Sequence, residues 1–271
     1  MAASTSTRTQ TRQTGRFVRS TDGSQSLERG LALLRAFRLG TGTLTNADLA
    51  NRTSLPRPTV SRLTRSLVDA GFLVYDVAER GYRLGAVCLS LALAHRSAQP
   101  ALDLALPLMR GLAEGRRINV GLAVADGTEM VYLDSVRRSR MGLFRHLVPG
   151  SRIPIALTSL GRAHLSALAS TDRRLLMARL APDYGTAWPA ISAAISESLA
   201  LIQRAGWCWA EWQPGMVAIA TPLCVSEGRQ YALNISLPAQ DGAGERLALE
   251  HGELLMTLAH HILERWRTSR G

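Results

Sequence analysis

Lysine is absent from this 271-residue chain, so all 32 of its lysine-or-arginine positions are arginine. This absence excludes every phosphate loop that depends on a lysine, including the Walker A motif. The sequence also contains neither an H-E-x-x-H zinc motif nor a G-x-S-x-G nucleophile elbow, and its six histidines form no other catalytic pattern. We therefore expect no catalytic residues and a protein that is not an enzyme.

Cysteine and long apolar runs are also scarce. Cys88, Cys208 and Cys224 lie far apart, and no pair has the C-x-x-C spacing of a redox or zinc site. We expect reduced, buried thiols, and neither a metal nor another cofactor. The longest apolar stretch, residues 86–94 with one serine, is far shorter than the ~20 residues that a membrane span requires. These features predict a cytoplasmic protein with no membrane partner.

The net charge of +11 is concentrated in the N-terminal part of the chain. Residues 1–97 carry 14 arginines and six acids, whereas the remaining residues carry 18 arginines and 15 acids. Codon bias explains the choice of arginine over lysine, but it does not explain this asymmetry. Nucleic acid is a natural partner for the basic part, because each neutralised phosphate releases condensed counterions.

The first 20 residues are rich in serine and threonine and carry four arginines and no acid. Organelle transit peptides share this composition, and so do the disordered basic arms of DNA-binding proteins. Either interpretation places the segment outside the fold. We predict a disordered basic arm over residues 1–23.

Two helices are predicted after this arm. Apolar residues recur at three- and four-residue spacing from Ser26 until Gly40-Thr41-Gly42 ends the pattern. Thr45, with Asp48 three residues further on, is typical of a capping box and opens a short second helix that ends near Thr53.

A third helix is predicted over residues 57–70. Pro56 precedes it, at a position where a missing N–H group is tolerated. Residues 72–76 and 81–84 have the composition of two short strands around a polar loop. Three helices and a hairpin in this order predict a winged helix-turn-helix over residues 24–84.

One face of the third helix carries hydroxyl and guanidinium groups, with no acid before Asp69. Such a face can donate hydrogen bonds to phosphates and to guanine edges. A merely solvated face is the alternative, but the local charge and the order of the elements favour DNA contact. An arginine in the predicted wing adds a phosphate or minor-groove contact. The predicted DNA-binding residues are Arg57, Thr59, Ser61, Arg62, Arg65 and Arg80.

The remaining sequence predicts an α+β domain, because its strands are divided by a helical insert. A helix over residues 85–98 and another from Pro100 to Leu112 have the apolar pattern of a linker and a dimerisation surface. Strands are predicted at residues 118–124, 129–136, 142–148, 207–211, 216–225 and 230–238, and helices at residues 158–169, 172–180, 188–205 and 243–267.

Two clusters in this part have open interpretations. Trp207, Trp209 and Trp212 are candidates for a ligand platform, although buried aromatic residues more often belong to a core. A group of arginines could neutralise a ligand carboxylate, although most charge runs are exposed surfaces. These arginines are Arg137, Arg138, Arg140, Arg145 and Arg152.

From about Ser24 to His261 the chain resembles the isocitrate-lyase-regulator (IclR) type family of bacterial transcription factors. In the N-terminal part the resemblance is carried by residues 26–31 (SLERGL), 55–63 (LPRPTVSRL), 70–72 (AGF) and 82–85 (YRLG). In the C-terminal part it is carried by residues 150–154 (GSRIP), 158–163 (TSLGRA), 214–220 (PGMVAIA) and 234–236 (NIS).

The resemblance implies a homodimer or homotetramer of winged-helix subunits, each with a GAF-like α+β effector-binding domain. It further implies that the effector is a small carboxylate or an aromatic acid. The family's pocket corresponds here to Leu160, Gly161, Glu211, Met216, Ala218, Asn234 and Ser236. Two positions depart from the family pattern, because Glu211 alone remains of an acidic run before Pro214 and Ala218 replaces a cysteine of some members.

The sequence therefore predicts a ligand-responsive regulator of a catabolic operon that binds a pseudo-palindromic site in double-stranded DNA. The alternative is a small-molecule-binding module whose helix-turn-helix serves only oligomerisation. The predicted layout is a basic arm (1–23), a winged helix-turn-helix (24–84), a linker helix (85–98) and a GAF-like effector-binding domain (99–271).

Overall fold

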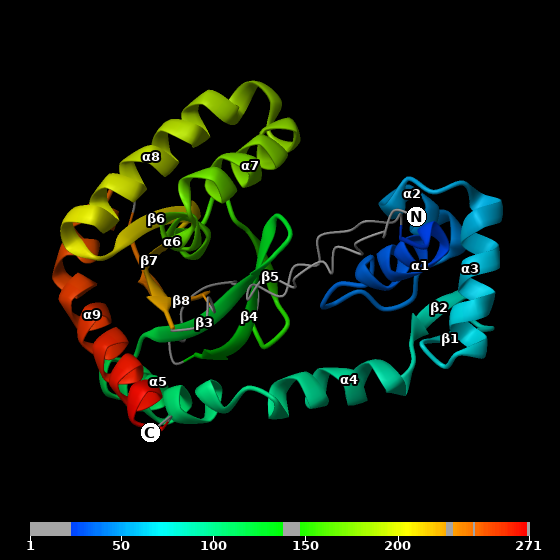
Figure 1. Cartoon of the computed structure of the whole chain (residues 1–271), viewed down its shortest axis with the longest axis horizontal. Coiled ribbons are helices and arrows are strands. Elements are labelled where there is room, and N and C mark those ends of the chain that lie inside the picture. Colours follow the sequence, from blue (N-terminus) through cyan, green and yellow to red (C-terminus); the bar gives the residue numbers. More distant parts are fainter. Residues whose placement is uncertain (1–22, 138–146, 226–229, 241, 270–271) are drawn as a thin grey trace, which may run out of the picture. The chain divides into compact units, whose positions relative to one another are not determined.

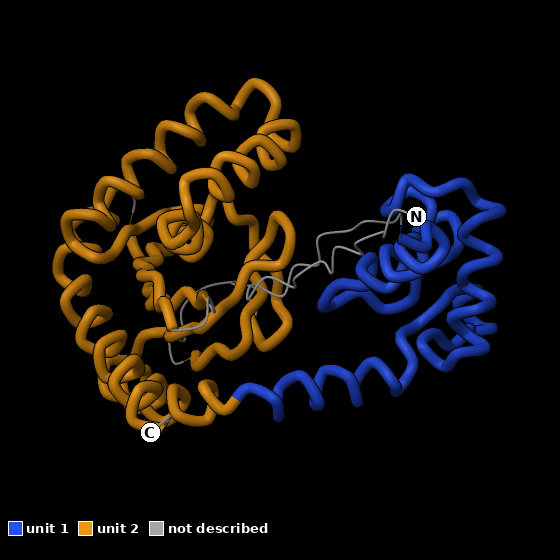
Figure 2. The backbone as a smooth tube through the Cα atoms, viewed as in Figure 1, with its two compact units in different colours: residues 1–99 blue, residues 100–271 orange. Residues whose placement is uncertain are grey.

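The computed structural model describes residues 23–137, 147–225, 230–240 and 242–269 (Figure 1). The chain divides into two compact units, Met1–Gln99 (unit 1) and Pro100–Gly271 (unit 2), and each is considered by itself (Figure 2). The predicted basic arm and the predicted strand at residues 142–148 fall almost entirely outside the described residues. Within those residues, no helix combines the length and the apolar character needed to cross a membrane.

Unit 1 is a winged helix-turn-helix, as the sequence predicts. Its elements are α1 (Gln25–Arg35), α2 (Asn46–Thr53), α3 (Arg57–Asp69), β1 (Leu73–Asp76), β2 (Gly81–Leu84) and α4 (Ala86–Ser97). Helix α1 ends before the apolar pattern does, since the backbone N–H of Ala36 caps it. Phe37 then packs against the core of the three helices from outside the helix.

Local capping and a small apolar core hold the three helices together. Leu33, Leu49 and Val60 are fully buried, one from each helix. The predicted capping box is confirmed: Thr45 Oγ1 accepts a hydrogen bond from Asp48 N (3.2 Å), and Asp48 Oδ2 accepts one from Thr45 N (2.9 Å). A hydrogen bond that Thr45 Oγ1 donates to Asp48 Oδ2 (2.6 Å), together with the one from Thr45 N, holds the pKa of Asp48 below its usual value.

The wing is joined to the segment between α1 and α2. Strands β1 and β2 are antiparallel, and Leu44 adds an isolated bridge to Tyr82. Leu44 N donates to Tyr82 O (3.0 Å), and Tyr82 N donates to Leu44 O (2.8 Å). Gly81 is required beside this bridge, because a Cβ there would overlap Thr43 and Leu44. The hairpin is therefore anchored to the helical core.

Unit 2 contains a six-stranded antiparallel sheet in the order β5-β4-β3-β8-β7-β6. The strands are β3 (Asn119–Asp126), β4 (Glu129–Val136), β5 (Arg152–Pro154), β6 (Cys208–Gln213), β7 (Met216–Cys224) and β8 (Gln230–Pro238). The helices are α5 (Pro100–Arg116), α6 (Ser159–Ala167), α7 (Ser170–Leu180), α8 (Trp188–Ala205) and α9 (Gly244–Thr268), with short 3-10 turns Ala181–Asp183 and Gly185–Ala187 between α7 and α8. Strand β5 was not expected, and the α+β class is confirmed.

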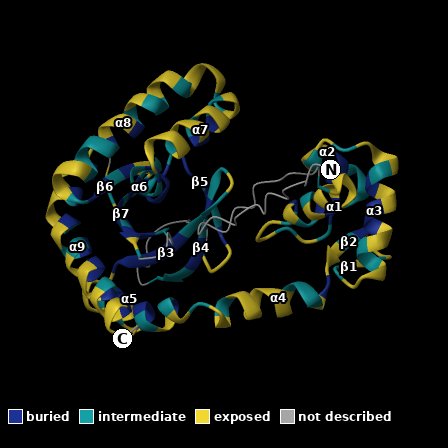
Figure 3. Cartoon of the chain, in the orientation of Figure 1, coloured by how far each residue is buried: buried dark blue, intermediate teal, exposed yellow. Residues whose placement is uncertain are grey.

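Buried residues are concentrated along the strands of this sheet (Figure 3), and its two faces differ in the size of their side chains. Helices α5 and α9 cover one face, where large residues such as Ile219, Leu233 and Ile235 form the core. Helices α6, α7 and α8 contribute to the core on the other face, where β7 and β8 provide the small residues Ala220 and Ala232. Side chains alternate between the two faces along a strand. Polar residues that lie an even number of positions from these alanines on the same strand are therefore also on the α6 side.

Candidate DNA-binding and effector sites

Helix α3 presents to solvent a basic surface that carries no acid before Asp69, the last residue of the helix. Val60, Leu63 and Thr64 are buried against the rest of unit 1. Of the predicted DNA-binding residues on this helix, Thr59 is half-buried, and the exposed ones are Arg57, Ser61, Arg62 and Arg65. Among the residues that the structure describes, the guanidinium groups of these three arginines have no hydrogen-bond or ion-pair partner. Their guanidinium groups are therefore available to an anionic partner.

Local chemistry fixes the position of α3. Pro56 is the N-cap residue and Pro58 lies in the first turn, where the missing N–H groups cost nothing. Thr64 Oγ1 lies 3.4 Å from Asn46 Oδ1 at the start of α2 and 3.1 Å from Ser61 O. This buried hydroxyl joins the two helices on the side opposite the arginines.

Arg80 lies in the turn of the wing and is exposed, with a φ of 50°. Asp76 is engaged within the hairpin, because it pairs with Arg83 (3.1 Å) and accepts a hydrogen bond from Glu79 N (3.0 Å). The acid is thus partly neutralised, and Arg80 is a separate positive group on the wing.

In unit 2, strand pairing brings several predicted effector residues onto one surface. Across the sheet, Ser236 pairs with Ala218 on one side and with Asn119 on the other. Asn234 pairs in the same way with Ala220 and Gly121. We call the α6-side surface that carries Asn119, Asn234 and Ser236 the polar face. All three side chains are buried, and Ala218 is half-buried.

The first turn of α6 lies beside the polar face. Helix α6 packs over β7 and β8, and Thr158 Oγ1 caps it by accepting from Gly161 N (3.2 Å). At the start of α6, Ser159 O accepts a hydrogen bond from Cys208 Sγ (3.5 Å). Cys208 lies on β6, where it pairs with Ala220. Leu160 and Gly161 are therefore brought toward the row of Ala220 and Asn234.

Two buried polar atoms beside this surface have no partner within the described part of the chain. They are Ser159 Oγ and Asn234 Oδ1. Burying a hydrogen-bonding atom without a partner is unfavourable, and each such atom in a native structure calls for an explanation. A bound polar ligand provides one.

Tyr132 is a further residue of this surface that the sequence did not indicate. A Cβ at Gly121 would overlap the Tyr132 ring and approach Asn234 Oδ1, so the ring and the amide both lie against β3. Burial raises the pKa of Tyr132 to about 12, although the positive charge of Arg137 and a hydrogen bond with Asn234 lower it. The phenol therefore stays neutral at ordinary pH.

The structure does not bring Glu211 together with the other predicted effector residues. A Cβ at Gly244 would overlap the Glu211 carboxylate, which places that carboxylate at the start of α9. Trp207 and Trp209 pack in the same core, on the α9 side. Trp212 alone of the three tryptophans packs on the α6 side, because side chains alternate between the faces along a strand and Trp212 is three residues after Trp209.

The predicted arginine cluster does not stay together either. Arg152 pairs with Asp126 (2.6 Å) and Glu129 (2.8 Å), so its charge is neutralised within unit 2. Arg138, Arg140 and Arg145 lie outside the described residues. Arg137 lies at the end of β4, and its Nε donates to Leu147 O (3.2 Å).

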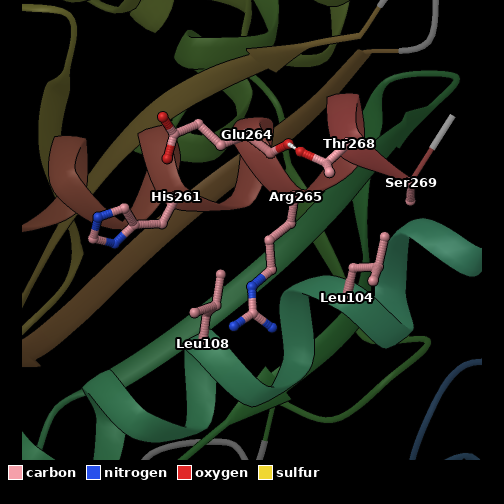
Figure 4. A pocket seen from close by; sticks show the side chains of 7 residues that line it. All are labelled: Leu104, Leu108, His261, Glu264, Arg265, Thr268 and Ser269. Atoms are coloured by element: carbon pink, nitrogen blue, oxygen red, sulfur yellow. Dashed lines mark hydrogen bonds between the residues drawn. The ribbon is translucent and has the colours of Figure 1, made fainter. Parts of the chain in front are cut away.

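A groove of about 550 Å³ runs along the opposite side of unit 2. Figure 4 shows Leu104 and Leu108 of α5 facing Arg265 of α9. His261, Glu264, Thr268 and Ser269 complete its lining. None of the predicted effector residues lines it, and α5 and α9 separate it from the sheet. We therefore place the candidate effector site on the polar face.

Unit 1 is a winged helix-turn-helix with an exposed arginine surface, and unit 2 is an α+β unit with buried polar atoms that lack a partner among the described residues. Together they define the class of DNA-binding regulators that carry a second domain. Comparison with known proteins identifies the family. The IclR helix-turn-helix domain matches residues 26–77, and the C-terminal domain of the bacterial transcriptional regulator IclR matches residues 96–263. The chain belongs to the IclR family of transcriptional regulators and carries its DNA-binding helix-turn-helix.

Individual relatives agree with this assignment. The Pca regulon regulatory protein of Pseudomonas putida is 30% identical over 227 residues, which are 81% of this chain and 76% of that protein. An IclR family regulator from Brucella abortus has a similar crystal structure, with a TM-score of 0.79, 32% identity and coverage of 89% and 91% of the two chains. An IclR homolog from Microbacterium hydrocarbonoxydans, complexed with 4-hydroxybenzoate, shares the fold with a TM-score of 0.70, 24% identity and coverage of 90% and 100%.

Proposed function

We propose that this regulator binds a pseudo-palindromic operator as a homodimer or homotetramer and that a small organic acid bound in unit 2 controls this binding. The observation that carries the proposal is the set of exposed arginines on α3 that have no partner in the described part of the chain. In a winged helix-turn-helix, this is the helix that enters the major groove. Arg80 on the wing adds a phosphate or minor-groove contact.

Within this proposal the residues of α3 divide by their chemistry. Arg57, Arg62 and Arg65 supply phosphate contacts and bidentate contacts to guanine, whereas Thr59 and Ser61 supply short hydroxyl donors. Two copies of α3 occupy successive major grooves, so the half-sites lie about 10 base pairs apart or a multiple of that.

Helix α4 supports the proposed oligomer. None of its residues is buried, and Leu89, Leu91 and Leu93 are 65%, 55% and 58% exposed. Leu27 and Leu31 on one face of α1 are exposed as well. Leu89 and Leu93 lie four residues apart on one face of α4, and an exposed apolar face of this kind marks an interaction surface. We assign residues 85–98 as a linker helix whose apolar side packs against a second copy.

The effector is proposed to bind the polar face of unit 2, which we assign to a GAF-like domain over residues 99–271. Asn234, Ser236, Ala218, Met216 and the first turn of α6 at Leu160 and Gly161 form the site; Glu211 is left out because it lies on the α9 side. A small carboxylate or aromatic acid is supported by the structural relative from Microbacterium hydrocarbonoxydans, which is complexed with 4-hydroxybenzoate. The proposed regulator is cytoplasmic, and its proposed target is a catabolic operon.

Effector control requires that the ligand binds differently to two arrangements of the protein. The coupling free energy between two such sites is typically ~1 to 3 kcal/mol, which changes operator affinity by roughly 5- to 150-fold. A thermal-shift screen of small carboxylates and hydroxylated aromatic acids identifies the effector, because a ligand that binds only the folded state raises its stability. A combined Asn234→Ala, Ser236→Ala variant should lose this shift, and an unchanged shift would remove the polar face from the proposal.

Fluorescence anisotropy on DNA from upstream of the protein's own gene, with scrambled DNA as reference, tests the DNA-binding role. Arg57→Ala combined with Arg62→Ala should weaken specific binding by at least about tenfold, since each good base contact contributes ~1 to 3 kcal/mol. Arg174→Ala combined with Arg179→Ala removes two exposed arginines of α7 and serves as the charge-matched control. Equal, weak binding of every duplex by all three proteins would favour a ligand-binding module whose helix-turn-helix serves only oligomerisation.

A further inference from the structure

Trp266 ties the last turns of α9 to the first turn of α5. Its side chain is buried, and its Nε1 donates a hydrogen bond of 2.7 Å to the backbone carbonyl of Ala101. The two residues are 165 positions apart in the chain, and the C-terminal end of α9 lies beside α5 (Figure 1). A buried indole N–H usually has such a partner, because an unpaired donor in a core is unfavourable. The contact therefore holds the first turn of α5 against the core of unit 2.

The same indole also contacts the sheet. Its ring centroid lies 5.1 Å from that of Tyr231 on β8, and Leu102 of α5 is fully buried in the core that both rings share. Tyr231 precedes Asn234 by three residues, so the two side chains lie on opposite faces of the sheet. Trp266 thus joins α9 both to the start of α5 and to the strand that carries Asn234.

The first turn of α5 is the point where the chain enters unit 2. Unit 1 ends at Gln99, and α5 begins at Pro100. The last backbone hydrogen bonds of α4 run from Ala98 N to Ala94 O (3.2 Å) and from Gln99 N to Arg96 O (3.0 Å). Pro100 has no N–H group, so this series of hydrogen bonds is interrupted there. The position of the first turn of α5 therefore determines where the linker helix is attached to unit 2.

At its other end, α4 is fixed to the winged helix-turn-helix. The N-cap residue Gly85 donates from its N to Phe72 O (2.8 Å), and Cys88 Sγ donates to the same carbonyl (3.6 Å). Phe72 N in turn donates to Leu67 O of α3 (2.8 Å). A Cβ at Gly85 would overlap Gly71 O, so the two backbone segments are in direct contact. Helices α4 and α3 therefore move together.

The length of α4 makes the position of α3 sensitive to the direction in which the linker leaves unit 2. Helix α4 has 12 residues, which at 1.5 Å per residue is a length of about 18 Å. A change of about 10° in its direction moves its far end by about 3 Å, close to the ~3.4 Å rise of one base pair. A regulator whose linkers leave unit 2 in a fixed direction therefore accepts one half-site spacing and rejects its neighbours.

We propose that Trp266 is a positioning residue for operator recognition. By holding the first turn of α5 it fixes the direction of the linker helices, and in this way it sets the half-site spacing that the regulator accepts. The proposal rests on the proposed DNA-binding function and adds to it a determinant of spacing that lies in unit 2. Through Tyr231, Trp266 is also the contact by which β8 reaches the start of α5.

Fluorescence anisotropy on operators of altered spacing tests this role. Footprinting of the upstream DNA locates the half-sites, and duplexes are then made with one or two base pairs inserted or removed between them. Wild-type protein should lose at least about tenfold in affinity for each altered spacing, because the DNA must deform to restore the register. Trp266→Phe keeps an aromatic ring but lacks the N–H donor, and it should lose less than about threefold. Its salt dependence should equal that of wild type, since the arginines of α3 are unchanged.

Trp207→Phe is the matched control. Trp207 is a buried tryptophan of the same core, but its ring packs against Gly252 of α9, so this variant measures a loss of core packing alone and should keep the wild-type spacing preference. Tyr231→Leu removes the ring beside Trp266 and should broaden the preference as Trp266→Phe does. Thermal unfolding of each variant shows that it is folded.

A folded Trp266→Phe protein with the wild-type spacing preference would overturn the proposal. An equal loss of preference in Trp207→Phe would also overturn it, because the effect would then belong to core packing in general. Wild-type protein that binds its operator but tolerates every spacing would overturn the positioning role and leave the DNA-binding function standing. Absence of any site-specific binding by wild-type protein would instead overturn the proposed function.

Discussion

Replacing Gly161 with alanine tests how closely α6 is packed beside the candidate effector site. Gly161 lies in the first turn of α6, and a Cβ on it would overlap the carbonyl group and Cα of Ile155. These are backbone atoms of a fully buried residue, so no flexible side chain can move aside. The helix itself must shift to accommodate the methyl group.

The cost follows from two contacts. Overpacking a well-packed interior typically costs about 1 to 3 kcal/mol. A shift of α6 also disturbs the cap, in which Thr158 Oγ1 accepts from Gly161 N at 3.2 Å, and a lost N-cap costs about 1 kcal/mol. The higher helix propensity of alanine offsets at most about 1 kcal/mol of this. We therefore expect the variant to lose about 1 to 4 kcal/mol of unfolding free energy.

Urea denaturation followed by tryptophan fluorescence measures this loss, because all five tryptophans lie in unit 2. Gly111→Ala is the matched control: Gly111 is an exposed glycine of α5, and a Cβ on it meets nothing within 4 Å. The control should be as stable as wild type or more stable by up to about 1 kcal/mol. A Gly161→Ala protein with wild-type stability would refute the packing described for α6.

Three further changes have defined outcomes. Thr45→Ala removes the capping box of α2 and should reduce helix stability by about 1 kcal/mol, seen as faster amide hydrogen exchange in α2, whereas Thr45→Ser should retain most of it. Leu33→Ala should cost unit 1 about 2 to 5 kcal/mol, because Leu33 is fully buried; circular dichroism during denaturation measures this, and a loss under 1 kcal/mol would contradict its place in the core. Burial lowers the pKa of His164 to about 4, so the unfolded state binds a proton that the folded state does not between about pH 6.5 and 4. Stability should therefore fall by up to about 3 kcal/mol as the pH decreases through this window, and it should fall less in His164→Gln; parallel pH profiles for the two proteins would rule out this contribution.

Much of the fold could be predicted because its signals are local. Thr45 with Asp48 marks the start of α2, and Pro56 marks the start of α3. The helix Trp188–Ala205 and the strand Gln230–Pro238 have the bounds that their patterns predict. Each of these signals depends on residues within a few positions of one another, which is why sequence patterns suffice.

The composition of the effector surface depends on pairing between distant strands. Asn234 meets Gly121 and Tyr132, which precede it by about a hundred positions, and no local pattern records that register. Glu211 follows Trp209 by two residues and therefore shares its face of the sheet. The sequence left open whether Trp209 and its neighbouring tryptophans belong to the core or to a ligand site, so it did not show that Glu211 lies on the α9 side. Strand β5 was missed because it has only three residues.

The salt dependence of operator binding tests the central claim, that α3 binds DNA through its arginines, most directly. Log K should fall linearly with log salt, with a slope of about −0.9 for each neutralised phosphate. If Arg57 and Arg62 each contact a phosphate, their double alanine variant should have a slope that is shallower by about 1.8, whereas the Arg174→Ala, Arg179→Ala control should keep the wild-type slope. Identical slopes for the wild type and both variants would contradict the assignment of α3 as the DNA-binding helix.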